Sequence, residues 1–159
     1  MNNKFKKDLY TGELGEKRAY EYLTNLDFTQ FVLDVRNDEF FQKLDVDFVH
    51  CDKEGNFRNI EVKTDTMAHR TGNLVYEHTS NKYYNTIGCF EKTRADIMFY
   101  YLTETDEMYT LTMYELRKYV RENSKYLREV NMGDNALGFL IKIDDLKNKG
   151  IMHLIESTY

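Results

Sequence analysis

The 159-residue sequence has no proline, no tryptophan, only two cysteines and no long apolar run. Cys51 and Cys89 are too few for a disulfide framework and lack metal-binding spacing. The apolar runs are shorter than the ~20 residues that cross a bilayer. No apolar segment follows the N-terminal lysines, as one would in a secretory signal. We therefore expect no membrane partner and a reducing, cytoplasmic location.

The composition is that of one globular domain, 1–159, with 42% hydrophobic and 31% charged residues. Abundant tyrosine, asparagine and lysine, without proline, are typical of an AT-rich genome, such as that of a low-GC bacterium or its phage. The net charge of −5 opposes nucleic-acid binding over the whole surface. A nucleic-acid partner would therefore need a local basic surface.

Hydrophobic periodicity predicts an α/β sandwich around a mixed sheet. The first helix covers about Tyr10–Leu26, and a second begins at the capping pattern of Thr112 and continues to about Glu129. A loop or short helix is expected around Asn85–Arg94. The predicted strands are Phe31–Val35, Leu44–Cys51, Phe57–Lys63, Asn73–Thr79, Asp96–Leu102, Met108–Leu111, Gly138–Ile143 and Ile151–Ile155.

The segment Leu44–Asp65 carries the most information about function. Its residues Lys53–Gly55 fit a three-residue hairpin loop with glycine in the left-handed position. This loop sets Asp47 opposite Glu61 and Asp45 opposite Lys63. Directly opposed Cβ atoms are about 4.5–5.5 Å apart, so two carboxylates meet with an ammonium beside them.

Opposed like charges destabilise a sheet unless a cation lies between them. Mg²⁺, with Mn²⁺ as a substitute, prefers such oxygen ligands. Lys63 would orient or activate a metal-bound water and neutralise charge on the reacting phosphate. The alternative is an ordinary solvated sheet face with alternating charges. Asp45 competes with Asp47 as the ligand if the register slips by two residues.

Asp47, followed fourteen positions later by Glu61-Val62-Lys63, resembles the signature of the PD-(D/E)XK nuclease superfamily. The segment Gly12–Ala19 is similar to the first helix of its Holliday-junction-resolvase-like members, in which a glutamate at the position of Glu16 faces the metal. The signature proline is absent, since Val46 precedes Asp47.

The resemblance implies a restriction-endonuclease-like αβββαβ core over about 9–111, with a mixed central sheet flanked by helices. The helix and strands predicted in 112–159 have no counterpart in this resemblance. It further implies a Mg²⁺-dependent endonuclease whose expected nucleic-acid substrate is DNA. Resolvase-like members are often dimers, so a homodimer is the expected assembly. Asp47, Glu61 and the Val62 carbonyl would bind the metal, Lys63 and Glu16 would complete the catalytic site, and Lys92 would contact substrate.

The predicted helix after Thr112 has a basic side. Arg117, Arg121, Lys125 and Arg128 follow one another at helical spacing. This stripe predicts a track for the phosphate backbone, and the alternative is the solvated side of an amphipathic helix.

A competing hypothesis is a catalytically inactive protein on the nuclease scaffold that binds nucleic acid or a host protein. The acidic net charge favours it, whereas the presence of all three motif residues favours the nuclease.

Overall fold

Two β-sheets organise the computed structural model, which describes the backbone of residues 3–155 and the side chains from Tyr10 onward. The larger sheet has the order β1-β2-β3-β6-β7-β10, and the smaller has the order β5-β4-β9-β8. Only β3 and β6 are paired in parallel among the described strands, so the larger sheet is mixed. The strands are β1 (Thr29–Asp34), β2 (Phe48–Asp52), β3 (Phe57–Asp65), β4 (Asn73–Asn81), β5 (Thr86–Ile87), β6 (Ile97–Leu102), β7 (Glu107–Thr112), β8 (Arg128–Gly133), β9 (Ala136–Lys142) and β10 (Met152–Ile155).

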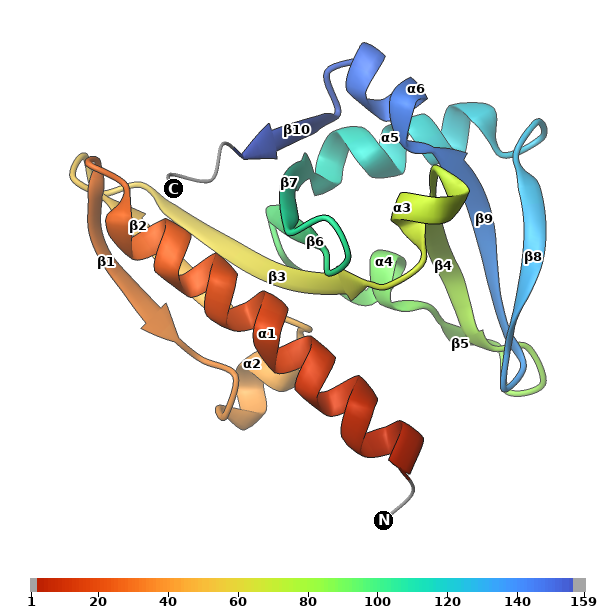
Figure 1. Cartoon of the computed structure of the whole chain (residues 1–159), viewed down its shortest axis with the longest axis horizontal. Helices are drawn as coiled ribbons and strands as arrows, with labels where there is room; N and C mark the ends of the chain where they lie inside the picture. Colours follow the sequence, from red (N-terminus) through yellow and green to blue (C-terminus); the bar gives the residue numbers. More distant parts are fainter. Residues whose placement is uncertain (1–2, 156–159) are drawn as a thin grey trace.

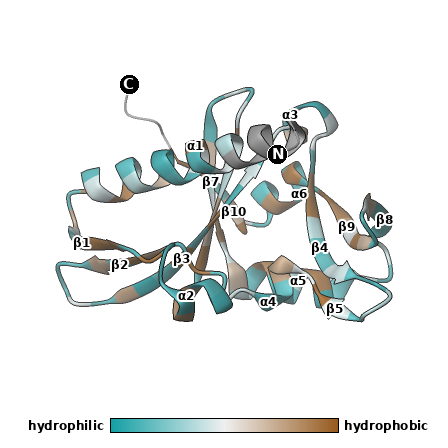
Figure 2. Cartoon of the chain, turned by 90° about the horizontal axis from the view of Figure 1, so that it is seen from below, coloured by the Kyte–Doolittle hydropathy of each residue, from teal (hydrophilic) through white to brown (hydrophobic). Residues whose placement is uncertain are grey.

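Helices cover both faces of the larger sheet, which confirms the predicted α/β class (Figure 1). Figure 2 shows α1 on one side of β1–β3, with α2, α4 and α5 on the other. The helices are α1 (Asn3–Asn25), α2 (Glu39–Lys43), α3 (Ala68–Thr71), α4 (Cys89–Lys92), α5 (Met113–Asn123) and α6 (Ile143–Asn148). None of these described helices has the length and apolar character to cross a membrane.

The alternation of β3 separates a core face from a polar face. Ile60 and Val62 pack with Ala19 and Leu23 of α1 in one hydrophobic cluster. A second cluster joins β6, β7 and α5 to β4 and β9 of the smaller sheet. Since side chains alternate along a strand, Glu61 and Lys63 point away from α1, toward the side on which the smaller sheet packs.

The predicted long helix after Thr112 is wrong at its C-terminal end. Helix α5 stops at Asn123, whose side chain donates to the Tyr119 carbonyl, and residues 128–133 form strand β8. Basic residues continue across this turn at spacings of four and then three, which is why the sequence imitates a longer helix. The short helix expected within Asn85–Arg94 is confirmed as the four residues of α4. The strand predicted at Asn73–Thr79 is present as part of β4, which belongs to the second sheet.

Candidate active site

The β2–β3 hairpin has the predicted register. Phe48 pairs with Ile60, and the Asp47 amide donates to the Ile60 carbonyl at 2.8 Å. Gly55 holds the turn with a φ of +83°, a left-handed conformation that suits glycine. Asp47 lies just before β2, and its amide donates to Ile60, the partner of Phe48, so the regular pairing ends before the predicted Asp47–Glu61 pair. The side chains of Asp47 and Glu61 are nevertheless close enough to interact.

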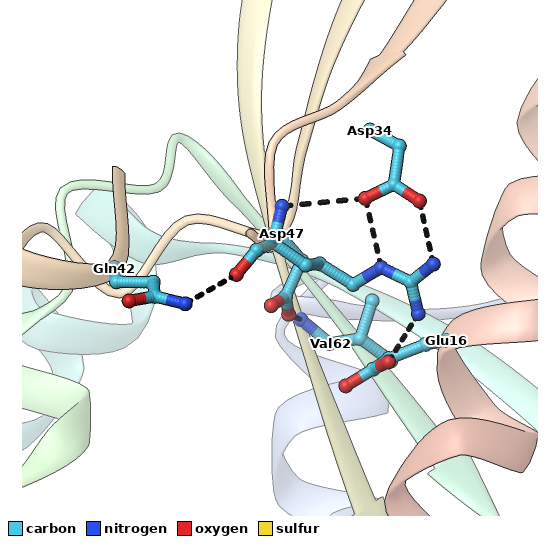
Figure 3. Close-up of polar contacts among 6 residues, drawn as sticks. Glu16, Asp34, Gln42, Asp47 and Val62 are labelled. Atoms are coloured by element: carbon cyan, nitrogen blue, oxygen red, sulfur yellow. Dashed lines mark hydrogen bonds and ion pairs between the residues drawn. The ribbon is translucent and has the colours of Figure 1, made fainter. Parts of the chain in front are cut away.

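The two carboxyl groups lie in an environment that disfavours their charged forms. Burial raises the pKa of Asp47 to about 6, although its Oδ2 accepts a 2.8 Å hydrogen bond from the Val62 amide (Figure 3). Burial and then the charge of Asp47 raise the pKa of Glu61 to about 9. Because both pKa values are raised, ionising these two partly buried acids is unfavourable. A bound cation would stabilise their charged forms.

Lys63 lies beside this pair on the same face of β3, and its ammonium is mostly buried. Burial alone would lower its pKa, but Cys89, Glu61 and Glu77 together raise it. Burial raises the pKa of the Cys89 thiol, so that group is uncharged near pH 7. Glu61, with its pKa raised to about 9, is likewise uncharged near pH 7 without a metal, so Glu77 is the carboxylate among these three groups.

Glu16 reaches the same region from α1, but an arginine holds its carboxylate. Arg36, in the loop after β1, forms a short ion pair with Glu16 and a second one of 2.5 Å with Asp34 (Figure 3). The guanidinium also lies 5.2 Å from the ring centroid of Phe48. The negative charge of Glu16 nevertheless acts on Asp47 and helps to raise its pKa.

The predicted pairing of Asp45 with Lys63 is wrong. Asp45 adopts a φ of +48° before the strand begins, and its carboxylate instead pairs with Lys92 at 2.7 Å. The chain turns there because the Val46 amide donates to the Phe41 carbonyl of α2, which takes Asp45 out of the hairpin ladder. Lys92, predicted to contact substrate, is thus engaged by a carboxylate.

The predicted basic stripe is wrong as well, because its members lie on different elements. Arg117 donates to the carbonyls of Phe90 and Thr93, at 2.9 and 2.6 Å. Lys125 is exposed in the turn after α5, and Arg128 is on β8. Instead, a cavity of about 580 Å³ at the start of α5 is lined by three arginines, namely Arg58, Arg117 and Arg121.

Among the residues that the structure describes, no group of three or more His, Cys, Asp or Glu side chains is arranged to hold a metal ion. Asp47 and Glu61 are the predicted carboxylate ligands whose side chains interact, and Glu16 forms an ion pair with Arg36. The structure thus brings together Asp47, Glu61 and Lys63, and it adds Arg36, Glu77 and Cys89, to which the sequence pattern assigned no role.

Gly88 fixes the approach of α4 to β4 at the rim of this site. A Cβ atom at Gly88 would lie 2.4 Å from the Glu77 carbonyl oxygen and 2.6 Å from its carbon. We expect Gly88→Ala to lower the free energy of unfolding by about 1–3 kcal/mol, because backbone atoms must separate.

Urea unfolding measures this effect, with Gly12→Ala as the control. Nothing lies within 4 Å of a Cβ at Gly12, which is inside α1. That change should stabilise the protein by about 0.5–1 kcal/mol. If Gly88→Ala and the wild type unfold at the same urea midpoint, the close packing of Gly88 against the Glu77 backbone is contradicted.

No protein-family model matches the sequence, and no curated protein matches it. Among solved structures, the chain is similar to the bacterial homing endonuclease I-Ssp6803I, with a TM-score of 0.46 and 21% identity over 65% of this chain and 68% of that chain. It is also similar to D212, a nuclease from a fusselovirus, with a TM-score of 0.46 and 12% identity over 86% and 82% of the two chains. Scores at this level carry no weight for the activity of this chain.

Proposed function

We propose that this chain is a metal-dependent nuclease that hydrolyses phosphodiester bonds in nucleic acid at Asp47, Glu61 and Lys63. The observation that carries the proposal is the adjacent pair of Asp47 and Glu61, whose side chains interact and whose pKa values are both raised, beside the mostly buried Lys63. A structural role alone gives no advantage to two adjacent, partly buried acids. A divalent metal ion bound by both would offset their repulsion and supply phosphoryl-transfer chemistry.

The donor set fits Mg²⁺, with Mn²⁺ as a substitute. The two carboxylates supply hard oxygen ligands, the Val62 carbonyl is a third candidate, and water and a substrate phosphate would fill the other positions. When bound, the metal would lower the pKa of a coordinated water and stabilise charge on the phosphate oxygens. The Val62 amide, which donates to Asp47, would hold that ligand in one orientation.

The side chains around the ligands have separate proposed roles. Lys63 donates a hydrogen bond to the attacking water or to a phosphate oxygen, where negative charge grows in the transition state. Glu16, released from Arg36, would complete the ligand shell or hold a water. Arg36 would then be free to contact a phosphate.

The cavity lined by Arg58, Arg117 and Arg121 is the proposed contact with the nucleic-acid backbone, with DNA as the first substrate to test. Hydrogen bonds through Thr93 connect it to the segment just before Asp47, because the Thr93 carbonyl accepts from Arg117 and its hydroxyl donates to the Asp45 carbonyl at 2.6 Å. A local basic cavity reconciles phosphate binding with a net charge of −5.

Substituting Arg58 and Arg121 together with glutamine is expected to raise KM and leave kcat nearly unchanged. Each lost phosphate contact should reduce the slope of log Kd against log salt by about 1. Binding titrations at several salt concentrations measure the slope. Arg128→Gln is the control because Arg128 lies on β8, away from the cavity, and should retain the full slope. If the salt slope decreases only in Arg128→Gln, the nucleic-acid interface lies on the second sheet.

The proposal is tested by a cleavage panel of duplex, single-stranded and branched DNA and of RNA, each with Mg²⁺, with Mn²⁺ and with EDTA. We expect metal-dependent products from at least one substrate and none with EDTA. No cleavage of any substrate would contradict the proposal. In that case the second candidate, an inactive binding module favoured by the acidic net charge, predicts no metal-linked rise in thermal stability.

A further inference from the structure

A cavity of about 380 Å³ lies next to Lys63, where the two sheets meet. Lys63 and Asp65 of β3 line one side, and Glu77 of β4 and Cys89 of α4 line another. Asp65 is fully engaged, because its carboxylate accepts from the Met67 and Ala68 amides and from Tyr100. The ammonium of Lys63 is the only lysine or arginine head group that lines this cavity among the described residues.

The alternation of β4 brings Glu77 to this cavity, because Val75, two residues earlier on the same face, lines it as well. The pairing of β4 with β9 is regular up to Glu77 and shifts register only after it. Gly88, without a side chain, lets the start of α4 lie against the Glu77 backbone. The Cys89 amide then donates to the Glu77 carboxylate at 3.2 Å, which fixes this side chain on the wall of the cavity that Lys63 also lines.

A mostly buried ammonium is costly unless an anion accompanies it. Glu61 is its neighbour on β3, but in the proposed function a metal ion takes up the charge of Glu61. Cys89 is uncharged near pH 7 and contributes no anion. The carboxylate that remains for Lys63, once the metal is bound, is Glu77.

We infer that Glu77 is a positioning residue, which holds the Lys63 ammonium at the edge of the Asp47–Glu61 pair from the second sheet. This inference rests on the proposed function and deepens it. It makes the smaller sheet part of the catalytic apparatus, although that sheet supplies no proposed metal ligand. It also favours Lys63 as a charged hydrogen-bond donor to water or phosphate, in preference to a neutral base.

Glu77→Gln tests this role, because glutamine keeps the oxygen that accepts from the Cys89 amide and removes the charge. We expect kcat to fall about 10–100-fold, as for other residues that orient catalytic groups, and KM to stay within about twofold. Glu129→Gln is the matched control, since Glu129 is exposed on β8 and lies 3.0 Å from the His78 ring. An unchanged kcat for Glu77→Gln, or a rise in KM alone, overturns the inference.

An NMR measurement separates this inference from the nuclease proposal. In ¹⁵N-labelled protein, an ammonium held by partners exchanges slowly with water and gives its own signal. We expect such a signal for Lys63, assigned by its loss in Lys63→Met, and we expect it to disappear in Glu77→Gln but not in Glu129→Gln. If it persists unchanged in Glu77→Gln, Glu77 does not position Lys63, whatever the protein cleaves. If the signal depends on Glu77 but no nucleic acid is cut, the nuclease proposal fails and the contact stands.

Discussion

Lys63→Met is expected to reduce kcat for nucleic-acid cleavage by about 10²–10³-fold, the usual effect of losing a donor aimed at developing charge. Methionine has a similar length and fills the same mostly buried space, but it has no ammonium. Loss of the charge is therefore expected to remove catalysis without disturbing the β2–β3 hairpin. Single-turnover cleavage with saturating Mg²⁺ measures the chemical step directly.

The control for this change is Lys142→Met, because Lys142 is exposed at the end of β9 and does not line the cavity next to Lys63. It should cleave at the wild-type rate. Circular dichroism and thermal unfolding should show both variants folded. Wild-type cleavage by Lys63→Met would show that the three-residue motif is a charged sheet face and that the reaction, if any, occurs elsewhere.

The hairpin at the centre of the site was predictable because its determinants are local. The turn at Lys53–Gly55 fixes the register, and a two-residue alternation then assigns each side chain to a face. Those two rules give the observed pairing of Phe48–Cys51 with Phe57–Ile60, and they bring Asp47 and Glu61 near each other at its end. The buried face of α1, which includes Ala19 and Leu23, was predictable for the same reason, because helical spacing within one segment determines it.

The sequence pattern failed where distant segments or an unusual backbone conformation decide the outcome. The positive φ at Asp45 depends on the α2 segment that folds against it, so counting along a strand missed it. Arg36, in the loop after β1, and Glu77, on β4, reach the site from outside the β2–β3 hairpin. A spacing rule within one hairpin contains no information on such contacts.

Metal-free Glu61→Gln is expected to be more stable than the wild type at pH 8, by about 1–3 kcal/mol in the free energy of unfolding. Burial raises the pKa of Glu61 to about 9, so the folded state binds a proton that the unfolded chain has already released. The free energy of unfolding of the wild type should therefore fall as pH rises from about 4 toward 9. Most of this decline should disappear in the variant, and the contribution of Asp47 near pH 6 should remain.

Mg²⁺ should reverse that order. A ligand that binds only the folded state adds about 2.7 kcal/mol at 100 times its Kd, and in the wild type it would bind to the charged carboxylates. Glu61→Gln removes one ligand, so its melting temperature should not respond to Mg²⁺ and its cleavage should be lost. Glu115→Gln, an exposed change on α5, should follow the wild type in both respects. If Glu61→Gln is instead less stable at pH 8 without metal, the opposed carboxylates are a stabilising structural pair. If Glu61→Gln makes the metal-free protein more stable but abolishes cleavage, then Glu61 serves the reaction and not the stability of the fold.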